Sequence, residues 1–170
     1  EFTNHNDLDA GKAAAKLLTG LGYRITFAGN AASARTYISK GFLRQAKKLI
    51  TKNILVLGPL VSDDCPLVGI EPSAILGFRD EFPDLAGDKL RPEASRLAQH
   101  TFTLEEFIAG EFSAGRIKRE MFTREPAEVL VHVHCQEKAI TTSAPVLAAL
   151  GIPVNYKVRE IPSGCCGMAG

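Results

Sequence analysis

Helix-like segments alternate with short apolar runs along the chain, and this alternation constrains the fold more than any other feature. The sequence predicts helices over residues 7–21, 37–52, 72–82, 137–150 and, as two helices, 88–112. It predicts strands over residues 24–28, 54–58, 67–70, 128–133 and 154–158. Strands that alternate with helices of this length favour an α/β fold with largely parallel sheets flanked by helices.

Three of the four cysteines lie in a pattern that packing alone does not explain. Cys135 follows a histidine, and Cys165 and Cys166 are adjacent and precede Gly167. Thiolates are good ligands for iron–sulfur clusters and zinc, and a neighbouring glycine lets the backbone turn so that both sulfurs face one site. The pattern therefore predicts a metal or redox centre, although a closed shell of four ligands would need one more donor.

Other interpretations of these cysteines stay open. Free cysteine often packs as a small hydrophobic side chain, and this applies to Cys135 more than to the pair. The segment 163–167 (SGCCG) is typical of a loop, which argues against an apolar packing role for Cys165 and Cys166. A structural disulfide is disfavoured because the cysteines are sparse and no secretory signal is visible.

Composition limits the classes of function. With 170 residues and 45% hydrophobic content, the chain can bury a sizeable core as one domain or two small halves. The net charge is +1 and the basic residues are scattered, so we expect no nucleic-acid partner. No apolar run approaches the roughly 20 residues that span a bilayer. We expect a cytoplasmic location, with any membrane contact peripheral or through a partner.

Two parts of the chain resemble each other. An ungapped superposition pairs residues 4–6 with 133–135 and residues 13–22 (AAAKLLTGLG) with 142–151 (TSAPVLAALG). After a short insertion, residues 32–34 fall opposite residues 165–167. The chain therefore reads as two pseudo-repeated βαβ halves, each built to present one ligand after one strand and a ligand pair after the next. Only the second half contains cysteines at these positions.

Specific segments resemble a known family. They are GIEPSAILGFRDEFPDL (residues 69–85), HVHCQEKA (132–139) and SGCCGMAG (163–170). They are similar to the cysteine-rich CCG domain of iron–sulfur oxidoreductases, which occurs in glycolate oxidases, the anaerobic glycerol-3-phosphate dehydrogenase anchor subunit, lactate-utilisation proteins and heterodisulfide reductase. The likeness covers nearly the whole chain. It is strongest to the form fused to FAD-linked 2-hydroxy-acid dehydrogenases.

The resemblance implies a role for each cysteine of the second half. In that family each half supplies a lone cysteine, then Cys-Cys-Gly, then Cys-x-x-Cys, and the domain holds a [4Fe–4S]-type cluster or zinc. Cys135 matches the lone cysteine, and Cys165 and Cys166 match the pair. We therefore expect these three residues to be the cofactor and metal ligands.

The first half departs from the family pattern. Ala32 and Ser33 stand where its cysteine pair is expected, and Ala74 replaces a further cysteine. The last ligand of the second half would lie beyond Gly170, and we expect the chain to be a fragment of a longer protein. The expected organisation is a degenerate first half without ligands (1–86), a helical connection (87–127) and a second half with the cysteine site (128–170).

The resemblance also implies a function. We expect an iron–sulfur electron-transfer domain of a flavin-linked oxidoreductase that acts on a small 2-hydroxy acid such as glycolate or lactate. Its partners would be an FAD-containing domain or subunit and other iron–sulfur domains. The fragment alone would be neither catalytic nor loaded with a cluster. The alternative is a structural zinc-binding or metal-free module that docks partners.

The histidines and the remaining cysteine have weaker interpretations. His132 and His134 flank the end of a predicted strand, and either could orient a cysteine or a metal through a hydrogen bond. We expect Cys65 to be incidental, and His5 and His100 to be surface residues.

Overall fold

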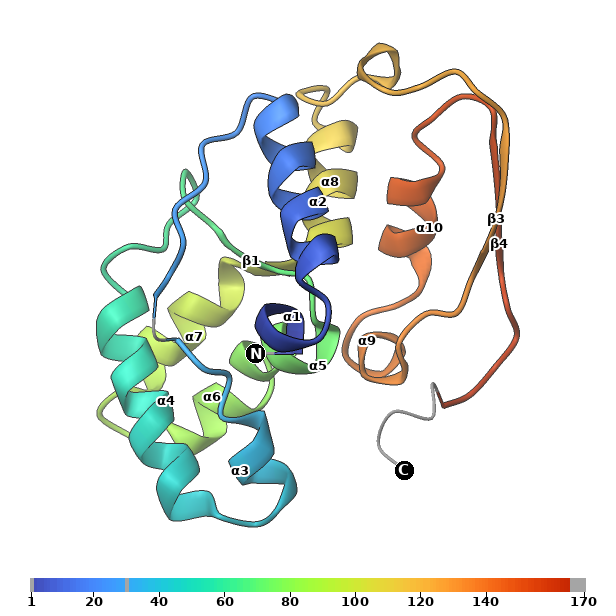
Figure 1. Cartoon of the computed structure of the whole chain (residues 1–170). Helices are drawn as coiled ribbons and strands as arrows, with labels where there is room; N and C mark the ends of the chain where they lie inside the picture. The colour runs from blue at the N-terminus through green and yellow to red at the C-terminus, as the bar shows by residue number, and fades with distance from the viewer. Residues whose placement is uncertain (1, 30, 166–170) are drawn as a thin grey trace. The chain divides into compact units, whose positions relative to one another are not determined.

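The computed structural model describes residues 2–29 and 31–165. The chain forms two compact units, unit 1 (Glu1–Thr103) and unit 2 (Leu104–Gly170). Each unit contains a two-stranded parallel sheet with helices around it, so the predicted α/β class with parallel strands is confirmed (Figure 1). In the described ranges, no helix combines the length and the hydrophobicity that crossing a membrane requires.

Unit 1 is mostly helical. Its elements are α1 (Phe2–His5), α2 (Leu8–Gly20), α3 (Arg35–Ser39), α4 (Leu43–Leu57), β1 (Leu67–Gly69), α5 (Pro72–Ile75), the 3-10 helix η1 (Leu76–Phe78), α6 (Glu81–Leu85), α7 (Arg91–Gln99) and β2 (Thr101–Thr103). Strands β1 and β2 pair in parallel, with Leu67 opposite Thr101 and Gly69 opposite Thr103.

The core of unit 1 lies where α4, α6 and α7 meet (Figure 1). Ile50, Ile54 and Leu57 recur at helical spacing on one side of α4 and are almost fully buried. They share the interior with Phe82 of α6 and Leu97 of α7, which have no exposed surface. Burying an aliphatic or aromatic side chain of this size contributes about 1.5–3 kcal/mol, so this cluster is a main source of the unit's stability.

The prediction of a strand over residues 54–58 is wrong, because this run continues α4 to Leu57. A short apolar run has the same composition in a buried strand and in a buried helix, and no glycine or proline separates it from the preceding helix. Asn53 and Ile54 are buried whereas Leu55 is 61% exposed, which is a helical pattern.

The prediction of a strand over residues 24–28 is also wrong, because the segment has no regular secondary structure. A strand needs a neighbouring strand for its backbone hydrogen bonds, and none of the described residues pairs with this segment. Phe27 is 81% exposed there. Conversely, the sequence did not indicate β2, whose three residues are too few to show an alternation of apolar and polar side chains.

The predicted helix over residues 37–52 divides at Gly41. Helix α3 ends at Ser39, and Gly41 has a φ of +75°, a backbone conformation that glycine adopts without strain. Helix α4 then begins at Leu43. The turn therefore interrupts the expected helix near its start.

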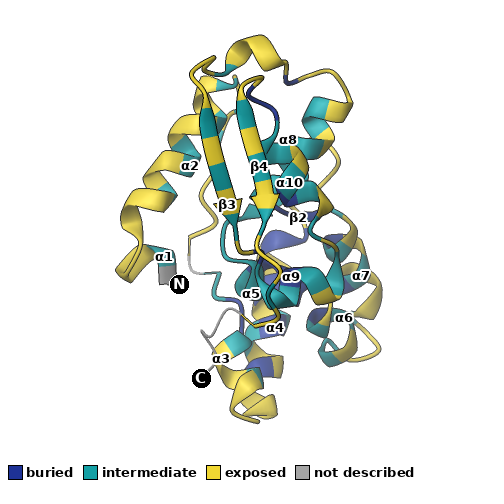
Figure 2. Cartoon of the chain, turned by 90° about the vertical axis from the view of Figure 1, so that its right-hand side faces the viewer, coloured by how far each residue is buried: buried dark blue, intermediate teal, exposed yellow. Residues whose placement is uncertain are grey.

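Unit 2 contains one βαβ crossover. Its elements are α8 (Leu104–Ser113), the 3-10 helix η2 (Arg119–Met121), β3 (Ala127–Val131), α9 (Cys135–Ile140), α10 (Ala144–Leu150) and β4 (Tyr156–Glu160). Strands β3 and β4 pair in parallel from Ala127 opposite Tyr156 to Val131 opposite Glu160. Exposed and half-buried residues alternate along both strands, as expected for a sheet with one covered face (Figure 2).

Helix α10 lies between the β3–β4 sheet and α8 (Figure 1). Val146 of α10 and Ile108 of α8 are buried there together with Ile152. A guanidinium nitrogen of Arg119 donates to the carbonyls of Gly151 and Ile152 at 3.0 and 2.8 Å, which secures the end of α10.

The predicted single helix over residues 137–150 is two helices. Thr141 leaves helical geometry with φ −122° and ψ −124°. Pro145, in the first turn of α10, has no N–H to donate to the preceding turn, so a continuous helix would lose a hydrogen bond here. The strands predicted over 67–70, 128–133 and 154–158 correspond to β1, β3 and β4. The division at residues 86 and 127 stays a prediction.

Candidate functional site

The two cysteine-bearing segments of unit 2 leave the same edge of its sheet. Strands β3 and β4 are parallel and end together at Val131 and Glu160, so the segments that follow them start side by side. The backbone N–H of Ile161 donates to the carbonyl of Val131 at 2.8 Å and extends the pairing beyond the strands. Cys135 follows β3 and Cys165 follows β4. This is the edge where ligands of parallel α/β sheets bind.

Cys135 is the first residue of α9 and is half-buried. The preceding His134 caps this helix, because its Nδ1 accepts a hydrogen bond from the N–H of Gln136 at 3.2 Å. His134 thus fixes the start of the helix that presents Cys135. Its predicted role in orienting a cysteine or a metal stays a prediction.

His132 connects the two segments. Its Nε2 lies 2.7 Å from the Oγ of Ser163, a hydrogen-bonding distance across the site. Ser163 precedes Cys165, which is exposed. Cys166, the second member of the predicted pair, lies outside the described residues, as does Gly167.

A second link runs through Lys138 of α9. Its ammonium donates to the carbonyl of Ser163 at 2.8 Å and lies 3.1 Å from Oε1 of Glu160. The same carboxylate oxygen accepts a hydrogen bond from the Oγ of Ser143 at 2.8 Å. The hydrogen bonds from Ser143 and Lys138, and then the charge of Lys138, lower the pKa of Glu160 below its ordinary value of 4.5.

The donor atoms at this edge suit a soft metal. In the described part of the chain, no three His, Cys, Asp or Glu side chains gather in a group that could hold a metal ion. The described residues provide the thiols of Cys135 and Cys165 from adjacent segments, whereas the carboxylate of Glu160 is engaged by Lys138 and Ser143. Sulfur donors fit an iron–sulfur cluster or zinc better than magnesium or calcium, which prefer oxygen.

The corresponding segment of unit 1 is a packed turn without sulfur. Ser33 and Ala34 are 5% and 1% exposed, and the side-chain amide of Asn53 donates to the carbonyl of Ala32 at 2.6 Å. Ala34 has a φ of +64°, and no other non-glycine residue in the described ranges has a positive φ. The sequence superposition places Ala34 opposite Gly167, and Ala34 adopts a backbone conformation that favours glycine.

The residues for which no site role was predicted, Cys65, His5 and His100, lie in unit 1. Cys65 is exposed in a turn closed by backbone hydrogen bonds to Ser62. His5 is exposed. His100 is not a plain surface residue, because its side chain is 20% exposed and its Nδ1 lies 3.2 Å from Oδ1 of Asp63. The β1–β2 pairing begins beside it, which explains its partial burial.

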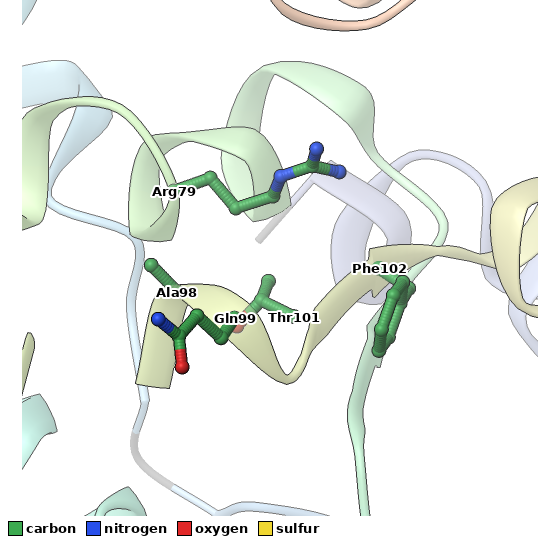
Figure 3. A pocket seen from close by; sticks show the side chains of 5 residues that line it. All are labelled: Arg79, Ala98, Gln99, Thr101 and Phe102. Carbon is green, nitrogen blue, oxygen red and sulfur yellow. The ribbon is translucent and has the colours of Figure 1, made fainter. Parts of the chain in front are cut away.

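Unit 1 also contains a shallow pocket of about 270 Å³ (Figure 3). It is lined by Arg79, Ala98, Gln99, Thr101 and Phe102. Figure 3 shows the side chain of Arg79 extending from one wall and Gln99 and Thr101 on the opposite wall. The pocket is smaller than the roughly 300–1,000 Å³ typical of small-molecule sites, and no cysteine lines it.

Comparison with curated proteins gives a consistent set of relatives. The chain is similar to D-2-hydroxyglutarate dehydrogenases. It is 26% identical to that of Escherichia coli (strain K12) over 171 residues, which cover 99% of this chain and 16% of the relative. It is 26% identical to that of Pantoea ananatis (strain AJ13355) over 156 residues, which cover 91% of this chain and 14% of the relative. It is 25% identical to that of Pseudomonas putida (strain KT2440) over 174 residues, which cover 99% of this chain and 16% of the relative.

The chain therefore spans about one sixth of the length of these relatives. No family model matches it. No solved structure matches it either. The expected likeness to 2-hydroxy-acid dehydrogenases is supported by the relatives' names, and the assignment to the CCG domain stays a prediction.

Of the residues that join the two cysteine-bearing segments, the sequence indicated His132 but not Lys138 or Ser163. Lys138 and Ser163 both lie inside the motif segments HVHCQEKA and SGCCGMAG, and that position was the available signal. Glu160 and Ser143 lie outside these motifs, and nothing in the sequence pattern distinguishes them from ordinary surface residues.

Proposed function

We propose that this chain is the iron–sulfur electron-transfer segment of a flavin-linked oxidoreductase that acts on a 2-hydroxy acid. The observation that carries this proposal is the alignment of 99% of the chain with part of D-2-hydroxyglutarate dehydrogenases. The placement of Cys135 and Cys165 after neighbouring parallel strands supports it. The chain's small share of its relatives' length leaves room in a complete protein for an FAD-containing part.

Cys135, Cys165 and Cys166 would hold the cluster, with at least one further ligand from elsewhere in the complete protein. When bound, an iron–sulfur cluster of the [4Fe–4S] type takes up and releases single electrons. The residues of this chain would set the position and the surroundings of the cluster, whereas the oxidation of the hydroxy acid would occur at the flavin. Zinc is the alternative occupant and would make the segment a structural or docking module.

The decisive experiment uses the complete protein, purified without oxygen. Iron, acid-labile sulfide, zinc and flavin are measured for each chain, and EPR spectra are recorded after reduction. Turnover is assayed with D-2-hydroxyglutarate, glycolate and lactate and an artificial electron acceptor. We expect iron and sulfide in a cluster ratio, an EPR signal of the reduced cluster, flavin, and oxidation of at least one of the three acids.

Matched variants connect this result to the site. Cys135→Ala and Cys165→Ala should each lower the iron content by about one cluster for each chain, because a cluster needs about four protein ligands. Cys65→Ala is the control, since Cys65 is an exposed cysteine in the other unit. Stoichiometric zinc with no cluster signal would support the structural module. An iron content that is the same in Cys135→Ala as in the wild type would contradict the proposed ligand set.

A further inference from the structure

Lys138 lies on the same side of α9 as Cys135. The two residues are three positions apart in this helix, and side chains at that spacing are neighbours on a helix surface, with Cβ atoms about 5–6 Å apart. A group held by Lys138 is therefore held on the side of α9 that carries the thiol.

The group that Lys138 holds belongs to the segment of Cys165. The ammonium donates to the carbonyl of Ser163 at 2.8 Å. The Oγ of the same serine lies 2.7 Å from Nε2 of His132. Two atoms of Ser163 are thus bound by residues on either side of Cys135, one before α9 and one within it.

The position of the ammonium is itself fixed. Glu160 lies 3.1 Å from it, and Ser143, at the start of α10, donates to the same carboxylate oxygen at 2.8 Å. The side chains of Lys138 and Glu160 are 24% and 28% exposed, so both are partly shielded from water. Hydrogen bonds that involve a charged group are stronger than neutral ones, and partial burial limits competition from solvent.

We infer that Lys138 is a positioning residue, which holds residues 161–165, the segment of Cys165, against the helix that begins at Cys135. The holding of the segment is a property of unit 2 alone. Its consequence for a metal centre rests on the proposed function. Arginine can replace the charge and the donors, whereas methionine keeps most of the side-chain volume and removes both.

The test compares Lys138→Met, Lys138→Arg and a control, Lys157→Met, in the complete protein. Lys157 lies on β4, and its side chain is 79% exposed, with Nζ 3.9 Å from Oε1 of Glu128. Hydrogen–deuterium exchange is measured for peptides that contain residues 161–165. We expect exchange in Lys138→Met to be roughly tenfold faster, as for the loss of one charged hydrogen bond, and Lys138→Arg and the control to stay near the wild type.

The second measurement is the release of iron to the chelator bathophenanthroline without oxygen. We expect Lys138→Met to retain iron about tenfold less well, as is usual when a group that supports metal ligands is lost. Unchanged exchange in Lys138→Met would overturn the inference. Faster exchange with unchanged iron retention would overturn its consequence for the ligands. If the wild-type protein holds no metal, the proposed function fails, and faster exchange would still support the holding role.

Discussion

The position that a Cβ atom would take at Gly69 lies 2.6 Å from the Cβ of Ile75. Gly69 ends β1, and Ile75 is the last residue of α5, which packs against that strand. Real Cβ atoms essentially never approach other atoms so closely. The glycine is therefore required by the contact between strand and helix and not by an unusual backbone angle.

Replacing this glycine should destabilise unit 1. We expect Gly69→Ala to lower the free energy of unfolding by about 1–3 kcal/mol, because the added methyl group must displace the core residue Ile75. Gly110→Ala is the control, since Gly110 lies inside α8 with no atom within 4 Å of the added Cβ. Alanine should stabilise that helix by up to about 1 kcal/mol. Urea denaturation measures the free energy of unfolding of both variants. An equal change in Gly69→Ala and Gly110→Ala would contradict a clash at Gly69.

Ala34 should tolerate glycine better than an ordinary buried alanine does. Its φ of +64° strains any residue with a Cβ by about 1–2 kcal/mol, and glycine would relieve this strain while losing one buried methyl group. We expect Ala34→Gly to change stability by less than about 1 kcal/mol. Ala46→Gly, at a fully buried position within α4, should cost about 1–2 kcal/mol. A larger loss at Ala34 than at Ala46 would be evidence against this account.

Glu81 should make unit 1 less stable as the pH rises. Burial raises the pKa of its carboxyl above 4.5, and Oε2 is buried with no hydrogen-bond partner among the described residues. The folded protein therefore holds this proton more tightly than the unfolded chain does. The resulting stabilisation is complete below pH 4.5 and is lost as the pH rises through the raised value.

Glu81→Gln should therefore be more stable than the wild type at neutral pH and lose that advantage below pH 4.5. Urea denaturation from pH 4 to pH 8, in about half-unit steps, provides the measurement. Asp84→Asn in the same helix is the control, because that carboxylate is 80% exposed. A constant difference between Glu81→Gln and the wild type across this range would exclude the titration of Glu81 as the cause.

Glu160 should behave in the opposite way. Its pKa is lowered by Ser143 and Lys138, so its contribution to stability is present above pH 4.5 and is lost as the pH falls through the lowered value. Ser143→Ala removes the first of these causes and should raise the pKa of Glu160 toward its ordinary value. Thr142→Val changes a neighbouring hydroxyl that bonds to Ala144 and is the control. Side-chain carbon NMR titration would reveal no difference between these variants if the hydrogen bond were unimportant.

The sequence predicted secondary structure correctly where residues with a strong conformational preference mark a strand or the end of a helix. Val129 and Val131 indicated β3, and Pro72 and Gly151 marked a helix start and a helix end that the structure contains. The apolar run at the end of α4 was misassigned because composition alone does not distinguish a buried strand from a buried helix.

The sequence predicted which segments form the candidate site, but not the side-chain contacts between them. Cys135 and Cys165 follow strands, as expected, and those strands are parallel neighbours. The contacts of Ser163 with His132 and Lys138 could not be predicted, because they join segments far apart in sequence and depend on the conformation of each side chain.

The order of the elements along unit 2 determines when β3 and β4 can pair during folding. Strand β3 leaves the ribosome before α9, which begins at Cys135, and before α10 and β4. Among the described residues β3 pairs only with β4, so it is unpaired until the whole crossover has been made. Pairing between parallel strands must first overcome the entropy of closing this long connection, so it is a late step. We therefore expect the two cysteine-bearing segments to meet near the end of the folding of unit 2, after α9, which carries Lys138, and α10, which Ser143 precedes, have formed.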